Sequence, residues 1–204
     1  MNQAQDRELL VTECPKPIRA PRRNDTLARV VADYIKHRRR RARKERTHFA
    51  KLRLREAVRL AGLAQTKEGK RFSHQRRVPT AALRRSADRL QDALPDLKAA
   101  RDFDALYALV QATVGGLRGI GALTVYDTAN RLGGKLKLEP RRVYLHAGTL
   151  AGARAIGIPT EQDVVAMSVF PKEFRRLRPR EVEDALCIFE ARLRHIKARR
   201  RGGG

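Results

Sequence analysis

The sequence has few aromatic residues, almost no cysteine and no long apolar stretch. Its 204 residues include no Trp, four Tyr, six Phe and two Cys. No apolar run approaches the roughly 18–20 residues that cross a bilayer, and the first residues lack the basic-then-apolar order of a secretion signal. Cys14 and Cys187 lie far apart, which favours free thiols in a reducing compartment over a metal cluster. We therefore expect no membrane association, no metal and no cofactor.

Acidic residues are also scarce. The chain has 46 Lys and Arg against 22 Asp and Glu, a formal net charge of +24. No fold requires such an excess, and its self-repulsion opposes compactness. A polyanionic partner is the simplest explanation, and nucleic acid is favoured over a membrane surface because Trp, a common interfacial anchor, is absent. We expect a cytoplasmic protein, associated with the nucleoid if it is bacterial.

Apolar spacing and capping residues predict an all-α fold. Helices are expected to start at Asn24–Thr26, at Pro79–Thr80 and after Asp102, and no segment alternates as strands do. Further helices are expected over about 123–132, after Pro140 as a pair of small-residue helices, after Thr160, and from Pro179 as one final helix; "GGKLKLEP" is expected to form a turn.

The composition suggests four segments. We expect an extended arm over 1–23, a basic N-terminal helical region over 24–63, a compact helical domain over 64–196 and a basic flexible tail over 197–204. The oligomeric state is left open.

One stretch, "LRGIGALT", has a chemical meaning of its own. Gly119 and Gly121 allow a tight turn and a close backbone approach, and Ile120 is expected to point into the core. The first amides of the following helix have no intrahelical partner and lie at the positive end of its dipole. With Arg118 and Thr124 beside them, they predict an anion site suited to phosphate.

The same residues resemble the helix-hairpin-helix family of DNA-binding motifs, whose pattern is hydrophobic-x-Gly-hydrophobic-Gly-x-x-Thr. The resemblance covers about 25 residues, from the helix before the turn to Leu132, with Val125 in place of the usual alanine. It implies that the turn amides bind a backbone phosphate without reading base sequence.

A looser resemblance extends to the helix-hairpin-helix DNA glycosylases. Val143 and His146 match that pattern, but the catalytic aspartate falls on Tyr144 and the lysine of bifunctional members on Leu123. Neither side chain can replace the missing group. Asp127 is the nearest other carboxylate, and a surface or helix-pairing role is favoured for it over catalysis. For His146, a hydrogen-bonded structural role is favoured over that of a catalytic base.

Basic residues outside the turn extend the predicted nucleic-acid interface. A run of like charges around a helix is costly unless phosphates lie close by, which favours a binding role for the basic run from Lys36 to Arg55. The residues predicted to bind nucleic acid are Arg38, Arg39, Arg40, Arg41, Arg43, Lys44, Arg46, Arg76, Arg77, Arg118, Gly119, Ile120, Gly121, Thr124, Lys135, Lys137, Arg141 and Arg142.

Three functions remain open from the sequence. A non-sequence-specific binder of duplex DNA backbone is favoured, because only Phe72 and Tyr144 are candidates for stacking on single-stranded bases. The alternatives are a glycosylase-like repair enzyme with displaced catalytic groups and an RNA- or ribosome-associated structural protein. The acids in "REVEDALCIFE" fit the start of a helix, so a metal nuclease is disfavoured.

Overall fold

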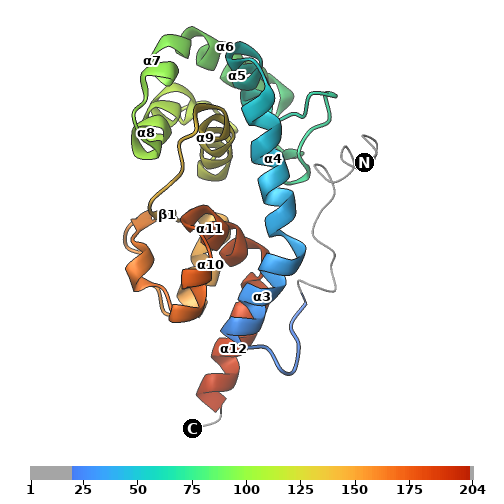
Figure 1. The fold of residues 1–204 in the computed structure, drawn as a ribbon, viewed down its shortest axis with the longest axis vertical. Helices are drawn as coiled ribbons and strands as arrows, with labels where there is room; N and C mark the ends of the chain where they lie inside the picture. Colours follow the sequence, from blue (N-terminus) through green and yellow to red (C-terminus); the bar gives the residue numbers. More distant parts are fainter. Residues whose placement is uncertain (1–19, 203–204) are drawn as a thin grey trace. The chain divides into compact units, whose positions relative to one another are not determined.

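The computed structural model describes the backbone of residues 20–202 and side chains up to residue 198. This part of the chain is mainly helical, as the sequence predicts, with one two-stranded antiparallel ribbon (Figure 1). None of its helices is long and apolar enough to cross a membrane. The contacts divide it into two units, and most of the predicted arm, residues 1–19, lies outside the described residues.

Unit 1 comprises the described residues 41–139 and holds the predicted turn. Its helices are most of α4 (Arg39–Lys51), then α5 (Leu54–Gly62), η1 (Ser73–Gln75), α6 (Thr80–Asp92), α7 (Leu94–Ala99), α8 (Phe103–Val114) and α9 (Ala122–Leu136). Helices α5 and α6 pack together, as do α8 and α9.

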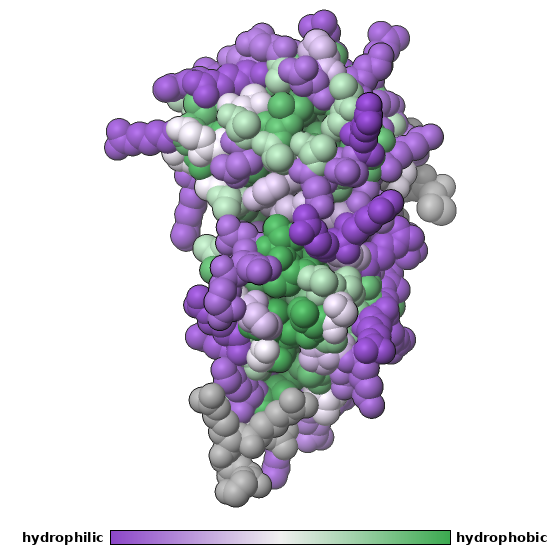
Figure 2. All heavy atoms as spheres, turned by 90° about the vertical axis from the view of Figure 1, so that its left-hand side faces the viewer, coloured by the Kyte–Doolittle hydropathy of each residue, from purple (hydrophilic) through white to green (hydrophobic). Residues whose placement is uncertain are grey.

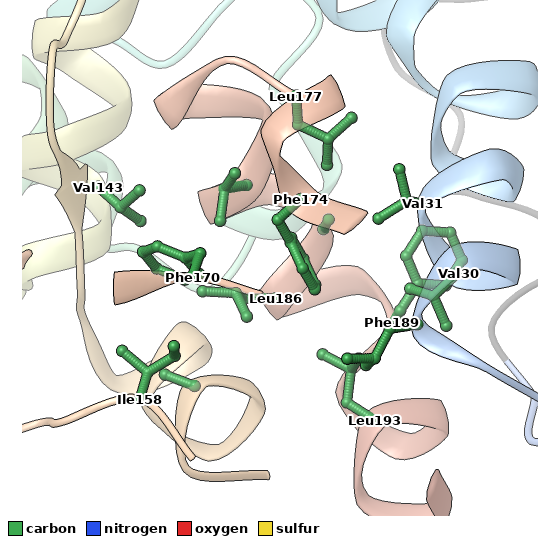
Figure 3. Close-up of a cluster of buried hydrophobic side chains, with 14 of the residues drawn as sticks. Val30, Val31, Val143, Ile158, Phe170, Phe174, Leu177, Leu186, Phe189 and Leu193 are labelled. Carbon is green, nitrogen blue, oxygen red and sulfur yellow. The ribbon is translucent and has the colours of Figure 1, made fainter. Parts of the chain in front are cut away.

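Unit 2 comprises the described residues 20–40 and 140–202. Its elements are α3 (Leu27–His37), β1 (Val143–Tyr144), α10 (Ala147–Ala155), β2 (Val164–Val165), η2 (Met167–Val169), η3 (Lys172–Arg176), α11 (Pro179–Ile188) and α12 (Glu190–Gly202). The cluster in Figure 3 joins α3 to α11 and α12, with Val30, Phe174 and Phe189 completely buried.

This division differs from the predicted segments. The expected basic region 24–63 is split between the units after Arg40, and the expected domain 64–196 is split after Glu139. The predicted tail is also wrong over 197–202, where α12 continues, while residues 203–204 lie outside the described part.

Helix starts with local capping signals are predicted correctly. The hydroxyl of Thr26 accepts a hydrogen bond from the N–H of Arg29 (3.2 Å) at the start of α3. The carboxylate of Asp102 does the same for Ala105 (2.8 Å) at the start of α8. Each cap satisfies an amide that the first helical turn leaves without a partner.

The predicted turn at 133–140 is wrong, because Gly133 and Gly134 lie inside α9. A Cβ at Gly133 would lie 2.6 Å from the carbonyl oxygen of Leu138, and one at Gly134 would lie 3.1 Å from that of Arg46. These glycines permit close packing within unit 1. The helix ends instead at Lys137, which adopts the left-handed conformation at φ 62°.

The predicted helices after Pro140 and Thr160 are also corrected. Val143–Tyr144 pairs with Val164–Val165 as a short antiparallel ribbon, and α10 begins only after His146. The last predicted helix is two helices, α11 and α12, separated at Phe189.

Hydrophilic side chains project over much of the face in Figure 2, and hydrophobic atoms lie between them in both its upper and its lower part. In unit 2, Leu150, Ile156 and Met167 are partly buried against the core. Val169 is the exposed large hydrophobic side chain among the described residues, at 45%. Charged side chains therefore supply most of the features by which this surface could recognise a partner.

Candidate phosphate-binding turn

Residues 115–121, hereafter the glycine turn, connect α8 to α9 in unit 1. The amide of Leu117 donates to the carbonyl oxygen of Val114 (3.0 Å), and the amide of Ile120 donates to that of Leu117 (2.9 Å). Leu117 and Ile120 are 8% and 7% exposed, so Ile120 points inward as the sequence predicts. The two apolar side chains fix the turn to the unit, and Arg118 between them is exposed.

The two central glycines have different physical roles. Gly119 adopts φ +95°, and a Cβ there would lie 3.0 Å from Cδ of Pro79. Gly119 therefore provides a left-handed conformation and a close contact with the start of α6. Gly121 has an ordinary φ of −98°, and a Cβ there would meet no atom within 4 Å. The absence of a side chain at Gly121 leaves open space beside the start of α9.

Gly121 directly precedes the first amides of α9. Gly121 is the N-cap and has no side chain to bond them, and the first backbone bond into the helix runs from Val125 to the carbonyl oxygen of Gly121 (3.1 Å). Gly121 and Ala122 are exposed and Leu123 is half-buried. Amides in this position carry the positive end of the helix dipole and suit an anion. Thr124 is only 6% exposed, so its side chain is mainly part of the core side of α9.

The loop before α6 brings two further predicted cations near the turn. Arg76 and Arg77 are exposed and directly precede Val78 and Pro79, the proline that Gly119 contacts. The sequence predicted these two residues and the turn separately, and the fold places them on neighbouring segments of unit 1.

Helix α9 anchors this loop through a buried arginine. The guanidinium of Arg131 lies 3.9 Å from the ring centroid of Phe72 and donates to Gln75 Oε1 (2.9 Å) and Glu45 Oε1 (2.9 Å). Arg131 is 2% exposed. A loop held by such contacts keeps its cations in place before any ligand binds, which lowers the ordering cost of binding.

His74 and Asp127 form a second anchor between the loop and α9. His74 Nε2 lies 2.8 Å from Asp127 Oδ2. Burial favours the neutral imidazole, but the charge of Asp127 and its hydrogen bond outweigh that effect and raise the pKa of His74. The carboxylate of Asp127 thus pairs with a neighbouring segment, the kind of role that its sequence context favoured.

Helix α6 adds two cations that the sequence did not single out. Arg89 Nη1 donates to the carbonyl oxygen of Thr113 (3.4 Å), at the end of α8. Arg85 is exposed and lies one turn before Arg89, on the helix whose Ala82 approaches Gly119. Their spacing on an amphipathic helix was visible in the sequence, but the packing of α6 beside the turn was not.

The predicted cations at the C-terminal end of α9 are not gathered at the turn, and two further predicted arginines are in unit 2. Lys135 and Lys137 lie at the opposite end of α9, about 20 Å along a helix rising 1.5 Å per residue, and Lys135 Nζ donates to the carbonyl oxygen of Ala50 (3.3 Å). Arg141 and Arg142 are exposed but belong to unit 2. A phosphate bound at the turn therefore lies too far from Lys135 and Lys137 to contact them.

Part of the basic run after residue 36 has intramolecular partners. In unit 2, Arg39 pairs with Glu181 (2.9 Å) and Arg38 with Asp184 (3.6 Å). In unit 1, Arg46 Nη1 donates to Asn130 Oδ1 (2.8 Å). The expectation that these charges need phosphates is corrected for these three arginines, because protein groups already bond them.

The remaining residues of the run differ in exposure. Arg40 and Arg43 are exposed, and Arg41 and Lys44 are half-buried with contacts inside the protein. Exposure leaves Arg40 and Arg43 accessible to a ligand, each in its own unit.

Leu123, singled out by the glycosylase resemblance, lies in the first turn of α9 in unit 1, and the downstream positions have structural roles in unit 2. Tyr144 is 4% exposed and lies in the ribbon. His146 caps α10 by accepting from the amide of Gly148 (3.2 Å), and its Nε2 lies 2.6 Å from Glu183 Oε1. His146 is therefore a buried, hydrogen-bonded histidine, as favoured from the sequence.

Comparison of the chain with protein-family models, with curated proteins and with solved structures finds no match. The candidate site consequently stands on its own geometry. Among the described residues, no group of three or more His, Cys, Asp or Glu side chains is arranged to hold a metal ion.

Proposed function

We propose that unit 1 binds the phosphate backbone of duplex nucleic acid, DNA in preference to RNA, without reading base sequence. The observation that carries the proposal is the open space at Gly121, at the exposed start of α9, where no side chain caps the first amides and Arg118 is exposed three residues earlier. Arg76 and Arg77 extend the positive charge on a loop anchored to the same helix. Amides and guanidinium groups together match a phosphate diester in charge and in hydrogen bonding.

The burial of aromatic side chains favours a duplex over a single strand. All six Phe are buried, and so are Tyr34, Tyr126 and Tyr144. Phe72 and Tyr144, the two stacking candidates from the sequence, are 1% and 4% exposed. Binding to single strands relies on exposed rings on which successive bases stack, and Tyr107, half-buried, is the remaining aromatic. Contacts to the backbone of a duplex need no such ring.

Salt titration tests this proposal. Each neutralised phosphate of B-DNA contributes about −0.9 to the slope of log affinity against log salt, so three arginines at the turn predict a slope at least as steep as about −2.7. Fluorescence anisotropy on two duplexes of unrelated sequence should give the same slope and similar affinity. A nearly flat slope would contradict backbone binding, and strong discrimination between the duplexes would contradict the lack of sequence reading.

Competition between nucleic acids tests the preferred partner. The proposal expects unlabelled duplex DNA to displace a labelled duplex at lower concentration than structured RNA or single-stranded DNA of equal length. If structured RNA competes better, the phosphate site serves an RNA-binding protein instead, since shape and backbone recognition use the same groups.

A further inference from the structure

Two carboxylates of α11 in unit 2 are paired with arginines near the end of α3: Glu181 is buried and Asp184 is partly exposed. Glu181 is 1% exposed; it accepts from Arg39 Nε (3.0 Å) and from the backbone amide of Arg178 (3.0 Å). Burial opposes its ionisation, but these hydrogen bonds and the charge of Arg39 outweigh that effect and lower the pKa of Glu181. Asp184, one turn further along α11, pairs with Arg38.

The cations beside these pairs remain on the surface. Arg39 Nη2 donates to the carbonyl oxygen of Arg176 (2.7 Å), which places the end of α3 beside η3. Lys36 and Arg40 near this end of α3, and Arg175 and Arg176 on η3, are all exposed. The acidic residue of η3, Glu173, is half-buried, so cations outnumber acids on the exposed surface.

We infer that Lys36, Arg40, Arg175 and Arg176 form a second phosphate-contacting surface, separate from the glycine turn. The internal pairs of Arg38 and Arg39 hold α3 and η3 together without using the four exposed charges. Four cations on two adjoining segments, beside Glu181 and Asp184 that are already paired with Arg39 and Arg38, are suited to the regular charges of a nucleic-acid backbone. The inference takes the identity of its polyanion from the proposed function and extends binding to unit 2.

A chain with one phosphate surface on each unit binds at two points. The second point is either further along the same duplex or on another duplex; the chemistry of the contact is the same in both cases. Two linked contacts strengthen binding beyond either one alone whenever both can be engaged together.

The test removes two charges from η3 in the full-length protein. Arg175→Gln with Arg176→Gln keeps both backbone carbonyls, so the bond from Arg39 is retained. Lys98→Gln with Arg101→Gln is the matched control, since these exposed residues lie beside Asp96, Asp102 and Asp104 in unit 1. Circular dichroism should show that both variants are folded. Affinity for a duplex is then measured across salt concentrations.

The η3 variant is expected to lose about 1.8 from the magnitude of the salt slope, two phosphates at about 0.9 each, while the control keeps nearly the full slope. The wild type is also tested for capture of a second, labelled duplex on beads that carry a tethered duplex. If the wild type captures it and the η3 variant does not, the second surface binds another duplex. If the slope changes without capture, the second surface binds the same duplex as the glycine turn. Equal slopes for variant and control overturn the inference, even if a substitution at Gly121 abolishes binding. If the η3 variant has a reduced slope and a substitution at Gly121 has no effect on binding, the second surface is supported and the glycine turn is excluded as a phosphate site.

Discussion

Replacing Arg192 with methionine is expected to lower the free energy of unfolding by about 3–5 kcal/mol, the usual cost of breaking a buried ion pair from one side. The side chains of Arg192 and Asp25 are both completely buried. Arg192 Nε donates to Asp25 Oδ1 (3.0 Å), and its Nη1 donates to Asp33 Oδ2 (2.8 Å), so one guanidinium on α12 holds two carboxylates at α3. Methionine fills similar volume and leaves the charge of Asp25 without its main partner.

The pH dependence gives this prediction a second readout. Burial opposes ionisation of Asp25, but the bonds from Arg192 and from the amide of Arg22, with the charges of both arginines, lower its pKa below 3.8. The pair therefore stabilises the wild type above pH 3.8 and loses that contribution as the pH falls through the lowered pKa. Without Arg192 the burial of Asp25 raises its pKa, so the deficit of the variant should shrink as the medium is acidified.

Urea denaturation followed by circular dichroism measures the effect. Arg194→Met is the matched control on the same helix, because Arg194 is 68% exposed and its pair with Glu190 contributes at most about 1 kcal/mol. Combining Arg192→Met with Asp25→Asn should recover much of the loss, since the buried charge is then removed as well. Equal unfolding midpoints for Arg192→Met and Arg194→Met would contradict the structural role of the pair.

Replacing Gly121 with valine is expected to weaken duplex binding at least about tenfold, or about 1.4 kcal/mol, with little change in fold. The position has an ordinary φ and open space, so valine meets no protein atom at its Cβ. Its methyl groups would instead occupy the space through which a phosphate approaches the amides of α9. Valine is a poorer N-cap residue than glycine, which lowers the free energy of unfolding by about 1 kcal/mol at most.

Gly116→Val is the control for this substitution. Gly116 is also exposed, lies in the same turn and offers open space to a Cβ. It lies at the α8 end of the turn rather than at the start of α9, so the control should bind with nearly wild-type affinity. Anisotropy titrations at one salt concentration compare the three proteins. Equal affinities of the wild type, Gly121→Val and Gly116→Val would show that the exposed arginines bind the duplex and that the amides at the start of α9 do not.

Features of the fold that depend on a few neighbouring residues could be predicted from the sequence. The caps at Thr26 and Asp102 act within a single helical turn, and the inward position of Ile120 follows from a short turn between two helices. The all-α class follows in the same way from local periodicity.

Features that depend on contacts between distant residues could not be predicted from the sequence. Gly133 and Gly134 look like a turn until the backbones of Leu138 and Arg46 are placed against them. The strand at Val143 forms because Val165 pairs with it, and two-residue strands have no alternation to detect. Because of this pairing, the residues shortly after Pro140 and Thr160 form a ribbon instead of the expected helices.

The basic run shows the same limit for the candidate site. Arg39 and Glu181 are separated by 142 positions in the chain, so the sequence could not show that acids of α11 neutralise part of the run. For the same reason the exposed surface of η3 was missed, and Arg76 and Arg77 could be named but not placed beside the glycine turn. Composition predicted a polyanionic partner; the fold decides which of the cations remain available to it.

The most direct measurement is a titration of the ¹⁵N-labelled protein with a short DNA duplex, following backbone amide resonances. If the start of α9 holds a phosphate, the amides of Gly121, Ala122 and Leu123 should show the largest shifts within unit 1, because they would donate to the bound oxygens. Unchanged resonances for these three amides at saturating duplex, with shifts confined to other residues, would contradict the account.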